Sequence, residues 1–169
     1  NKKILSKNKL LTTICYRLKN KNTYALEGSI FIAGAGVQWL RDKIRLIDNA
    51  YKTEIIAKSK KSNEGIYVVP AFTGLGAPYW SSESRGIITG LTRNSDWKNL
   101  VRSVLESVAY QTHDLFEAMR KDGSKTKIIN KNVRTPKIYT TRSIVFSRPS
   151  EPDIDAINFV LYENIAPKK

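Results

Sequence analysis

The sequence predicts an α/β or α+β domain in which one long amphipathic helix packs against short strands. Two observations support this: the elements follow the order strand, strand, helix, strand, strand, helix, and residues 96–120 show a clear helical periodicity of apolar side chains. With 169 residues and 41% hydrophobic content, the chain can build one domain with a true core but not two large domains.

The first half of the chain contains two predicted strands and a helix. Residues 10–18 are rich in β-branched and apolar side chains and predict a strand. Residues 23–32 predict a second extended segment, interrupted by Gly28. The period then changes, and residues 33–47 predict a helix with a single apolar face. That face consists of Val37, Leu40, Ile44 and Ile47.

The middle of the chain alternates loops with short strands. Residues 58–65 are a polar loop, and the apolar run 66–72 contains Pro70, which predicts a strand that ends early. Residues 73–80 (TGLGAPYW) have the glycines and proline of a turn. Residues 85–92 predict another strand.

The helix over 96–120 has an apolar face, an expected N-cap at Ser95 and a left-handed stop at Gly123. Its face is formed by Val101, Leu105, Val108, Thr112, Leu115 and Met119. Beyond it, residues 124–150 are basic and weakly periodic, and residues 152–165 have apolar side chains at roughly helical spacing.

The composition limits the classes of partner. A formal charge of +14 suits nucleic acid, anionic lipid or a phosphorylated ligand, although biased codon usage also produces lysine-rich surfaces. The single cysteine, Cys15, excludes an internal disulfide and a cysteine zinc cluster. We find neither a membrane-spanning run nor a signal peptide, so we expect no membrane partner and a cytoplasmic location.

Three ordered segments of the chain are similar to one family. Residues 10–42 contain LEGSIFIAGAGVQWLRD, residues 65–80 read GIYVVPAFTGLGAPYW, and residues 85–117 contain RGIITGLTR and SVLESVAYQTHDLFEAM. Together they resemble the glycerol kinases of the FGGY carbohydrate kinase family. The resemblance covers residues 3–125, expected to be the C-terminal-domain-like region, and leaves 126–169 as an unmatched basic tail. The matches to the family signature are Gly86, Ile88, Gly90, Leu91, Asn99, Leu100, Ser103, Val104, Leu105 and Glu106.

The resemblance implies a fold and a reaction. Members of the family resemble actin and hexokinase, with two α/β domains that close over a cleft holding ATP, a divalent metal and glycerol. This chain would be an incomplete second domain, of the actin-like or ribonuclease H-like ATPase fold. The implied activity is ATP-dependent phosphorylation of glycerol to glycerol 3-phosphate, with ATP or ADP and Mg²⁺ as cofactors.

The resemblance assigns nucleotide binding to Gly34 and Gln38. The physical chemistry of these residues agrees, because a glycine lets the backbone approach a ligand and a glutamine four residues later lies on the same helical face. The alternative is that Gly34 and Gly36 only permit tight packing of the helix. The loop 73–80 could line a cleft, but we favour a structural turn with Tyr79 and Trp80 buried. His113 beside Asp114 is interpreted as a surface histidine.

The family's catalytic aspartate, glycerol contacts and phosphate-binding threonines have no counterpart in this sequence, so we assign no catalytic and no metal-binding residue. Downstream, Asp122-Gly123 comes too early to match the family's Asp-Gly-Gly stretch. The sequence therefore predicts a truncated and marginally stable kinase remnant that is inactive alone. Possible partners are a separate N-terminal kinase domain or a second copy of the chain. The alternatives are a basic nucleic-acid-binding module, which no motif supports, and a decayed product with no function.

Overall fold

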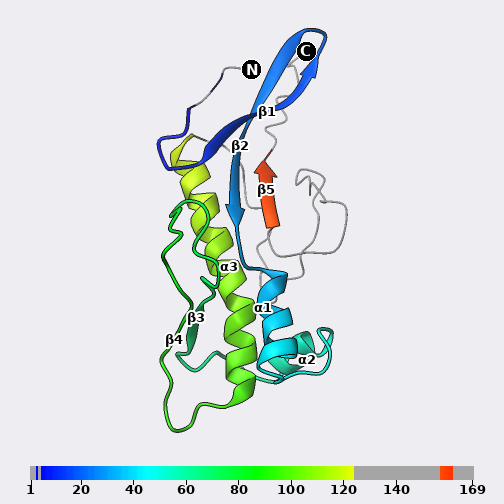
Figure 1. Cartoon of the computed structure of the whole chain (residues 1–169), viewed down its shortest axis with the longest axis vertical. Helices are drawn as coiled ribbons and strands as arrows, with labels where there is room; N and C mark the ends of the chain where they lie inside the picture. Colours follow the sequence, from blue (N-terminus) through cyan, green and yellow to red (C-terminus); the bar gives the residue numbers. More distant parts are fainter. Residues whose placement is uncertain (1–2, 4, 124–156, 162–169) are drawn as a thin grey trace.

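The computed structural model describes residue 3, residues 5–123 and residues 157–161 of the chain. Helix α3, Trp97–Lys121, is the longest element of this region. Strands β1, Leu11–Leu18, and β2, Lys21–Ile30, lie beside the C-terminal half of α3 (Figure 1). Helices α1, Gly34–Gln38, and α2, Lys52–Lys58, lie beside its N-terminal half.

Strands β1 and β2 form an antiparallel hairpin in which Leu18 pairs with Lys21. Lys19 and Asn20 make the two-residue turn, and both have positive φ, of 46° and 63°. That backbone shape matches the right-handed twist of paired strands. The predicted strand over 10–18 is thus confirmed to within one residue. Large apolar side chains on β1 remain exposed, namely Leu11, Ile14, Tyr16 and Leu18.

Strand β5, Ile157–Leu161, extends the sheet to the order β1-β2-β5 and runs antiparallel to β2, with Ile157 opposite Ile30. The helix predicted over 152–165 is therefore wrong for these five residues. Their apolar residues also fit an alternation of two, and the edge of β2 supplies a pairing partner that local spacing cannot reveal. The rest of the predicted tail, 126–169, lies outside the described residues.

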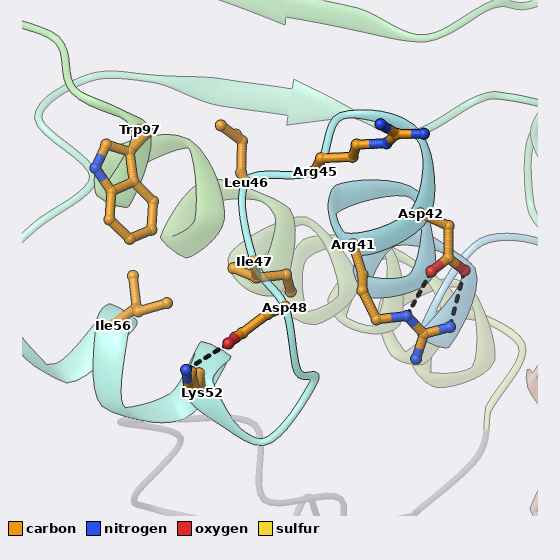
Figure 2. Close-up of a pocket in the computed structure, with 9 residues that line it drawn as sticks. All are labelled: Arg41, Asp42, Arg45, Leu46, Ile47, Asp48, Lys52, Ile56 and Trp97. Carbon is orange, nitrogen blue, oxygen red and sulfur yellow. Dashed lines mark hydrogen bonds and ion pairs between the residues drawn. The ribbon is translucent and has the colours of Figure 1, made fainter.

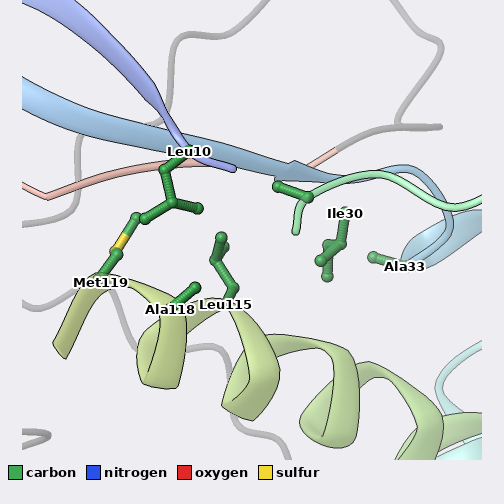
Figure 3. Close-up of a cluster of buried hydrophobic side chains, with 7 residues drawn as sticks. Leu10, Ile30, Ala33, Leu115, Ala118 and Met119 are labelled. Carbon is green, nitrogen blue, oxygen red and sulfur yellow. The ribbon is translucent and has the colours of Figure 1, made fainter. Parts of the chain in front are cut away.

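Strand β2 is continuous through Gly28, whereas the sequence predicted an interruption there. The glycine lies under α3: a Cβ on Gly28 would be 2.2 Å from Leu115 Cδ1, so close packing of helix on strand requires the missing side chain. The apolar cluster around this contact, the hairpin core, is drawn in Figure 3. It consists of Leu10, Ile30, Ala33, Ala77, Leu115, Ala118 and Met119.

The segment predicted as one helix over 33–47 is divided. Helix α1 passes directly into a π-helical turn, η1, Trp39–Lys43. The amide of Ile44 donates to the Trp39 carbonyl at 3.0 Å, a spacing of five residues rather than four. The wider turn moves Ile44 out of the predicted apolar face, and it is 43% exposed. Leu40 and Ile47 are buried as predicted.

A second apolar core joins η1 and the loop that follows it to α3 and to strand β3, Tyr67–Val69. Strand β3 ends before Pro70, as predicted. Strand β4, Ile87–Thr89, pairs antiparallel with β3 and is shorter than the predicted 85–92. Helix α2 was not foreseen. Arg102 of α3 holds it by donating to the carbonyls of Ala57 and Lys60 at 3.0 and 2.7 Å. The second core consists of Leu40, Ile47, Val68, Val101 and Val104.

The ends of α3 are fixed by side chains and by a glycine. The N-cap is Asp96, not the predicted Ser95: its carboxylate accepts from the amides of Lys98 and Asn99 at 2.8 and 3.0 Å. Asn99 completes a reciprocal capping box with Asp96, which Ser95 cannot do because it lies one residue too early. Gly123 follows the helix at φ 90°, as predicted.

The carboxylate of Asp122, at the C-cap of α3, accepts hydrogen bonds from the start of the chain. The Lys7 amide donates to it at 2.8 Å, the Asn8 side chain at 2.7 Å, and the Ser6 hydroxyl also donates to it. These contacts tie the segment before β1 to the end of α3. In the part of the chain that the structure describes, every helix is too short or too polar to span a lipid bilayer.

Candidate functional site

The predicted nucleotide-binding residues lie at the two ends of α1. Gly34 is its first residue and Gln38 its last, and both are partly exposed. Because they are four residues apart in one helix, they share a face. Ala33 at the N-cap offers no side-chain acceptor, and the Gln38 amide makes no hydrogen bond to a described residue. The Gly36 amide is already bonded to the Ala33 carbonyl at 3.2 Å, so the Gln38 side-chain amide is the polar group that this face presents without a partner among the described residues.

The packing alternative applies to Gly36, the other glycine of α1. It is buried, and a Cβ on it would lie 3.0 Å from Val104 Cγ1 of α3. Gly36 thus allows α1 to approach α3 closely. Ala33, whose carbonyl accepts from the Gly36 amide at 3.2 Å, is buried in the hairpin core. One glycine of the pair serves packing, while Gly34 stays at the surface.

An open pocket of about 900 Å³ lies beyond η1, between the following loop, α2 and the start of α3 (Figure 2). It was not predicted from the sequence, because its walls come from three segments that only the tertiary fold brings together. Its lining combines apolar side chains with charged ones. The lining residues are Arg41, Asp42, Arg45, Leu46, Ile47, Asp48, Lys52, Ile56 and Trp97.

Two of the three cations in the pocket are paired with neighbouring carboxylates. Arg41 makes a two-pronged contact with Asp42, at 2.6 and 2.8 Å. Lys52 contacts Asp48 at 2.6 Å. Each hydrogen bond lowers the pKa of its aspartate. Arg45 has no ion pair with any described residue. The lining therefore carries one uncompensated positive charge.

The loop 73–80 is a structural turn, but the prediction that its aromatic residues are buried is wrong. Tyr79 is 49% and Trp80 41% exposed. Hydrogen bonds anchor them instead: the Tyr79 hydroxyl donates to Asp114 at 2.7 Å, and the Trp80 indole to the Lys9 carbonyl at 2.6 Å. These polar groups lie at the ring edges, so each ring can bind at one end and stay exposed at the other.

His113 lies at the surface, as predicted. Its neighbour Asp114 accepts from Tyr79, and this hydrogen bond raises the pKa of the Tyr79 phenol. Asp114 thus anchors the loop 73–80 through Tyr79. Among the described residues there is also no group of three or more histidine, cysteine, aspartate and glutamate side chains that could hold a metal ion.

Comparison with known proteins agrees with the resemblance seen in the sequence. The profile of the FGGY family of carbohydrate kinases, C-terminal domain, matches residues 2–131. The chain belongs to this family. The FGGY chain is 59% identical over 121 residues to glycerol kinase 1 of Pseudomonas aeruginosa, and 55% identical over 129 residues to the glycerol kinase of Gluconobacter oxydans. These matches cover 72% and 76% of the chain.

Solved structures give the same fold. The FGGY chain superimposes on a crystal structure of Plasmodium falciparum glycerol kinase with ADP, with a TM-score of 0.66 and 41% identity over 72% of the chain. A ligand-bound xylulose kinase from Lactobacillus acidophilus shares the fold, with a TM-score of 0.57 and 20% identity over 66% of the chain. The predicted actin-like ATPase fold of sugar kinases is confirmed.

The matches cover only part of the relatives. The chain spans about a quarter of the length of the glycerol kinases that it matches, 24% and 25% for the two named above. The same holds for the superimposed Plasmodium structure, of which the chain covers 24%. Kinase ancestry is favoured over the alternative of a basic nucleic-acid-binding module.

Proposed function

We propose that this FGGY chain binds an adenine nucleotide through α1, with Gly34 and Gln38 in contact with the ligand. The observation that carries the proposal is the 41% identical glycerol kinase whose crystal structure contains ADP, and which superimposes on 72% of the chain. The exposed face of α1 supports it, because both residues are accessible and the Gln38 amide has no partner among the described residues.

Each residue contributes a different interaction. Gly34 has no side chain to obstruct a ligand, so its backbone can come close to it. Gln38 carries a donor and an acceptor, which together can read the edge of a purine base. The described residues offer no carboxylate cluster for a metal. We therefore expect Mg²⁺ to arrive with the nucleotide's phosphates, as this ion commonly does.

The reaction that we propose for the complete enzyme is phosphoryl transfer from ATP to glycerol in the cytoplasm. Such a transfer requires a base for the attacking hydroxyl and charges that neutralise the moving phosphoryl group. The chain spans about a quarter of the matched glycerol kinases. We therefore propose that the region 3–125 acts with further kinase polypeptide, as a separate N-terminal domain or in a homo-oligomer, and that the 169 residues alone do not phosphorylate glycerol.

Calorimetric titration with ADP, with and without Mg²⁺, tests the binding proposal. We expect saturable binding, and a Gln38→Ala variant that binds roughly tenfold more weakly, the effect of losing about one strong hydrogen bond. Asn22→Ala, which removes an amide from β2, is the matched control and should bind like the parent chain. A chain that melts cooperatively yet takes up no ADP would refute the proposal.

An activity assay tests the second half of the proposal. Purified chain is incubated with ATP, Mg²⁺ and glycerol, and glycerol 3-phosphate is measured. We expect none. Formation of product that is abolished by Gln38→Ala would show that these residues contain their own catalytic base, and the requirement for further polypeptide would be wrong.

A further inference from the structure

Two backbone irregularities follow α1 in direct succession. The first is the π-helical turn η1, Trp39–Lys43. The second is Arg45, which has a φ of 57° although it is not a glycine. π-helical turns in helices often occur at functional sites. A long side chain in the left-handed region costs about 1 kcal/mol or more, so it persists only where the surrounding structure enforces it.

Together these irregularities build one side of the pocket in Figure 2. The π turn carries Arg41, and the left-handed residue sends the chain back across the end of the helix, where the Leu46 amide donates to the Leu40 carbonyl at 2.9 Å. Ile47 and Ile56 supply apolar surface. Figure 2 shows the Trp97 ring near Ile56, on the side of the pocket opposite the two arginines.

The charges of the pocket favour an anion. Asp42 and Asp48 are each held by their own cation, Arg41 and Lys52, so they repel an incoming anion only weakly. Arg45 has five N–H donors and no ion pair among the described residues. The planar guanidinium of arginine can donate two parallel hydrogen bonds to a carboxylate or phosphate group.

The opposite side of the pocket favours an apolar or aromatic body. Trp97 is 42% exposed and lines the pocket with Leu46 and Ile56. The Lys98 ammonium lies over one face of its ring, 5.8 Å from the centroid, and the other face can stack on an apolar body. We propose that this pocket is a binding site for a small organic anion, with the anionic group at Arg45 and an aromatic or aliphatic body against Trp97. Neither Gly34 nor Gln38, the two residues of the proposed function, lines this pocket.

The experiment uses the whole 169-residue chain, labelled with ¹⁵N. It contains three tryptophans, so three indole N–H signals are expected, and Trp97→Phe identifies that of Trp97. The probe is 1-naphthyl phosphate, and inorganic phosphate and 1-naphthol test its two halves separately. We expect a saturable shift of the Trp97 signal at lower concentrations of the whole probe than of either half. Added salt should weaken binding.

Arg45→Asn removes the charge while asparagine still tolerates the left-handed backbone. It should weaken binding of the probe about tenfold, as expected for one charge-assisted hydrogen bond. The matched control is Arg17→Asn on the exposed end of β1, which should bind like the parent chain. Because the salt dependence is measured on the parent chain, the test holds even if the Arg45 variant does not fold.

Three results would overturn the proposal. The first is a Trp97 signal that does not respond to the probe. The second is an equal loss of affinity in the Arg45 and Arg17 variants, which would indicate only the general positive charge of the chain. The third is an ADP-induced shift of Trp97 that disappears in Gln38→Ala, which would make the pocket part of the nucleotide site. Failure of ADP to bind anywhere leaves this test unaffected.

Discussion

Replacing Gly28 by alanine should destabilise the hairpin core. The new Cβ would lie 2.2 Å from Leu115 Cδ1, whereas carbon atoms in contact prefer about 3.5–4.0 Å. Leu115 is fully buried, so it cannot rotate into free space. Overpacking of this kind costs about 1–3 kcal/mol. Alanine loses less backbone entropy on folding than glycine does, and this offsets about 0.5–1 kcal/mol of the cost. We therefore expect Gly28→Ala to lower the free energy of unfolding by up to about 2.5 kcal/mol.

A double-mutant cycle with Leu115→Ala measures whether the clash is the cause. Leu115→Ala alone should cost about 2–5 kcal/mol, because it leaves a cavity. In the double variant the new methyl occupies part of that cavity, so the combined loss should be smaller than the sum by about 1 kcal/mol or more. Urea unfolding followed by circular dichroism gives the four free energies. Gly86→Ala is the control, since a Cβ on this exposed glycine would come no closer than 3.1 Å to the Phe72 ring and 3.5 Å to the Val69 carbonyl oxygen. Strictly additive losses would refute the reasoning.

Two further predictions concern the ends of α3. Asp96→Ala should lower the melting temperature more than Ser95→Ala, because Asp96 accepts from the amides of Lys98 and Asn99 and forms an ion pair with Lys60 at 2.7 Å; equal losses in thermal unfolding would place the cap elsewhere. At Asp122, burial pushes the pKa up, but hydrogen bonds from Ser6 and its neighbours outweigh it and lower the pKa. The stabilisation is thus complete above the ordinary carboxyl pKa of about 4 and is lost as pH falls through the lower folded-state value. The advantage of the parent chain over Asp122→Asn in free energy of unfolding should therefore shrink below about pH 4, and an advantage that does not depend on pH would contradict this.

The strands and helices were predictable wherever the pattern is local. The period of α3, the strand β1 and the end of β3 before Pro70 follow from spacing and from single-residue chemistry. The position of Ile44 was not predictable, because the spacing argument assumes 3.6 residues per turn and η1 widens the turn. The N-cap was misplaced by one residue because serine and aspartate both cap well, and only the reciprocal bond that the Asp96 amide donates to the Asn99 side chain decides between them.

The two candidate sites also differ in whether their residues are close together in the sequence. Gly34 and Gln38 could be named from the sequence because they lie within one helix, and their role in binding stays a prediction. The pocket could not, because Trp97 and Ile56 meet the loop after η1 only through tertiary packing. The pairing of β5 with β2 is also non-local, which explains why spacing alone suggested a helix there.

The hairpin core has a consequence for how the chain is made. One half of it comes from residues 10–33 and the other largely from residues 115–119 of α3. A ribosome adding roughly 5–20 residues per second needs about 4–17 s to go from Ile30 to Leu115. During that interval Leu10, Ile30 and Ala33 have no helix to cover them. Nascent chains are thus most prone to associate in this window, and a chaperone that binds apolar strands would raise the yield by acting before α3 is synthesised.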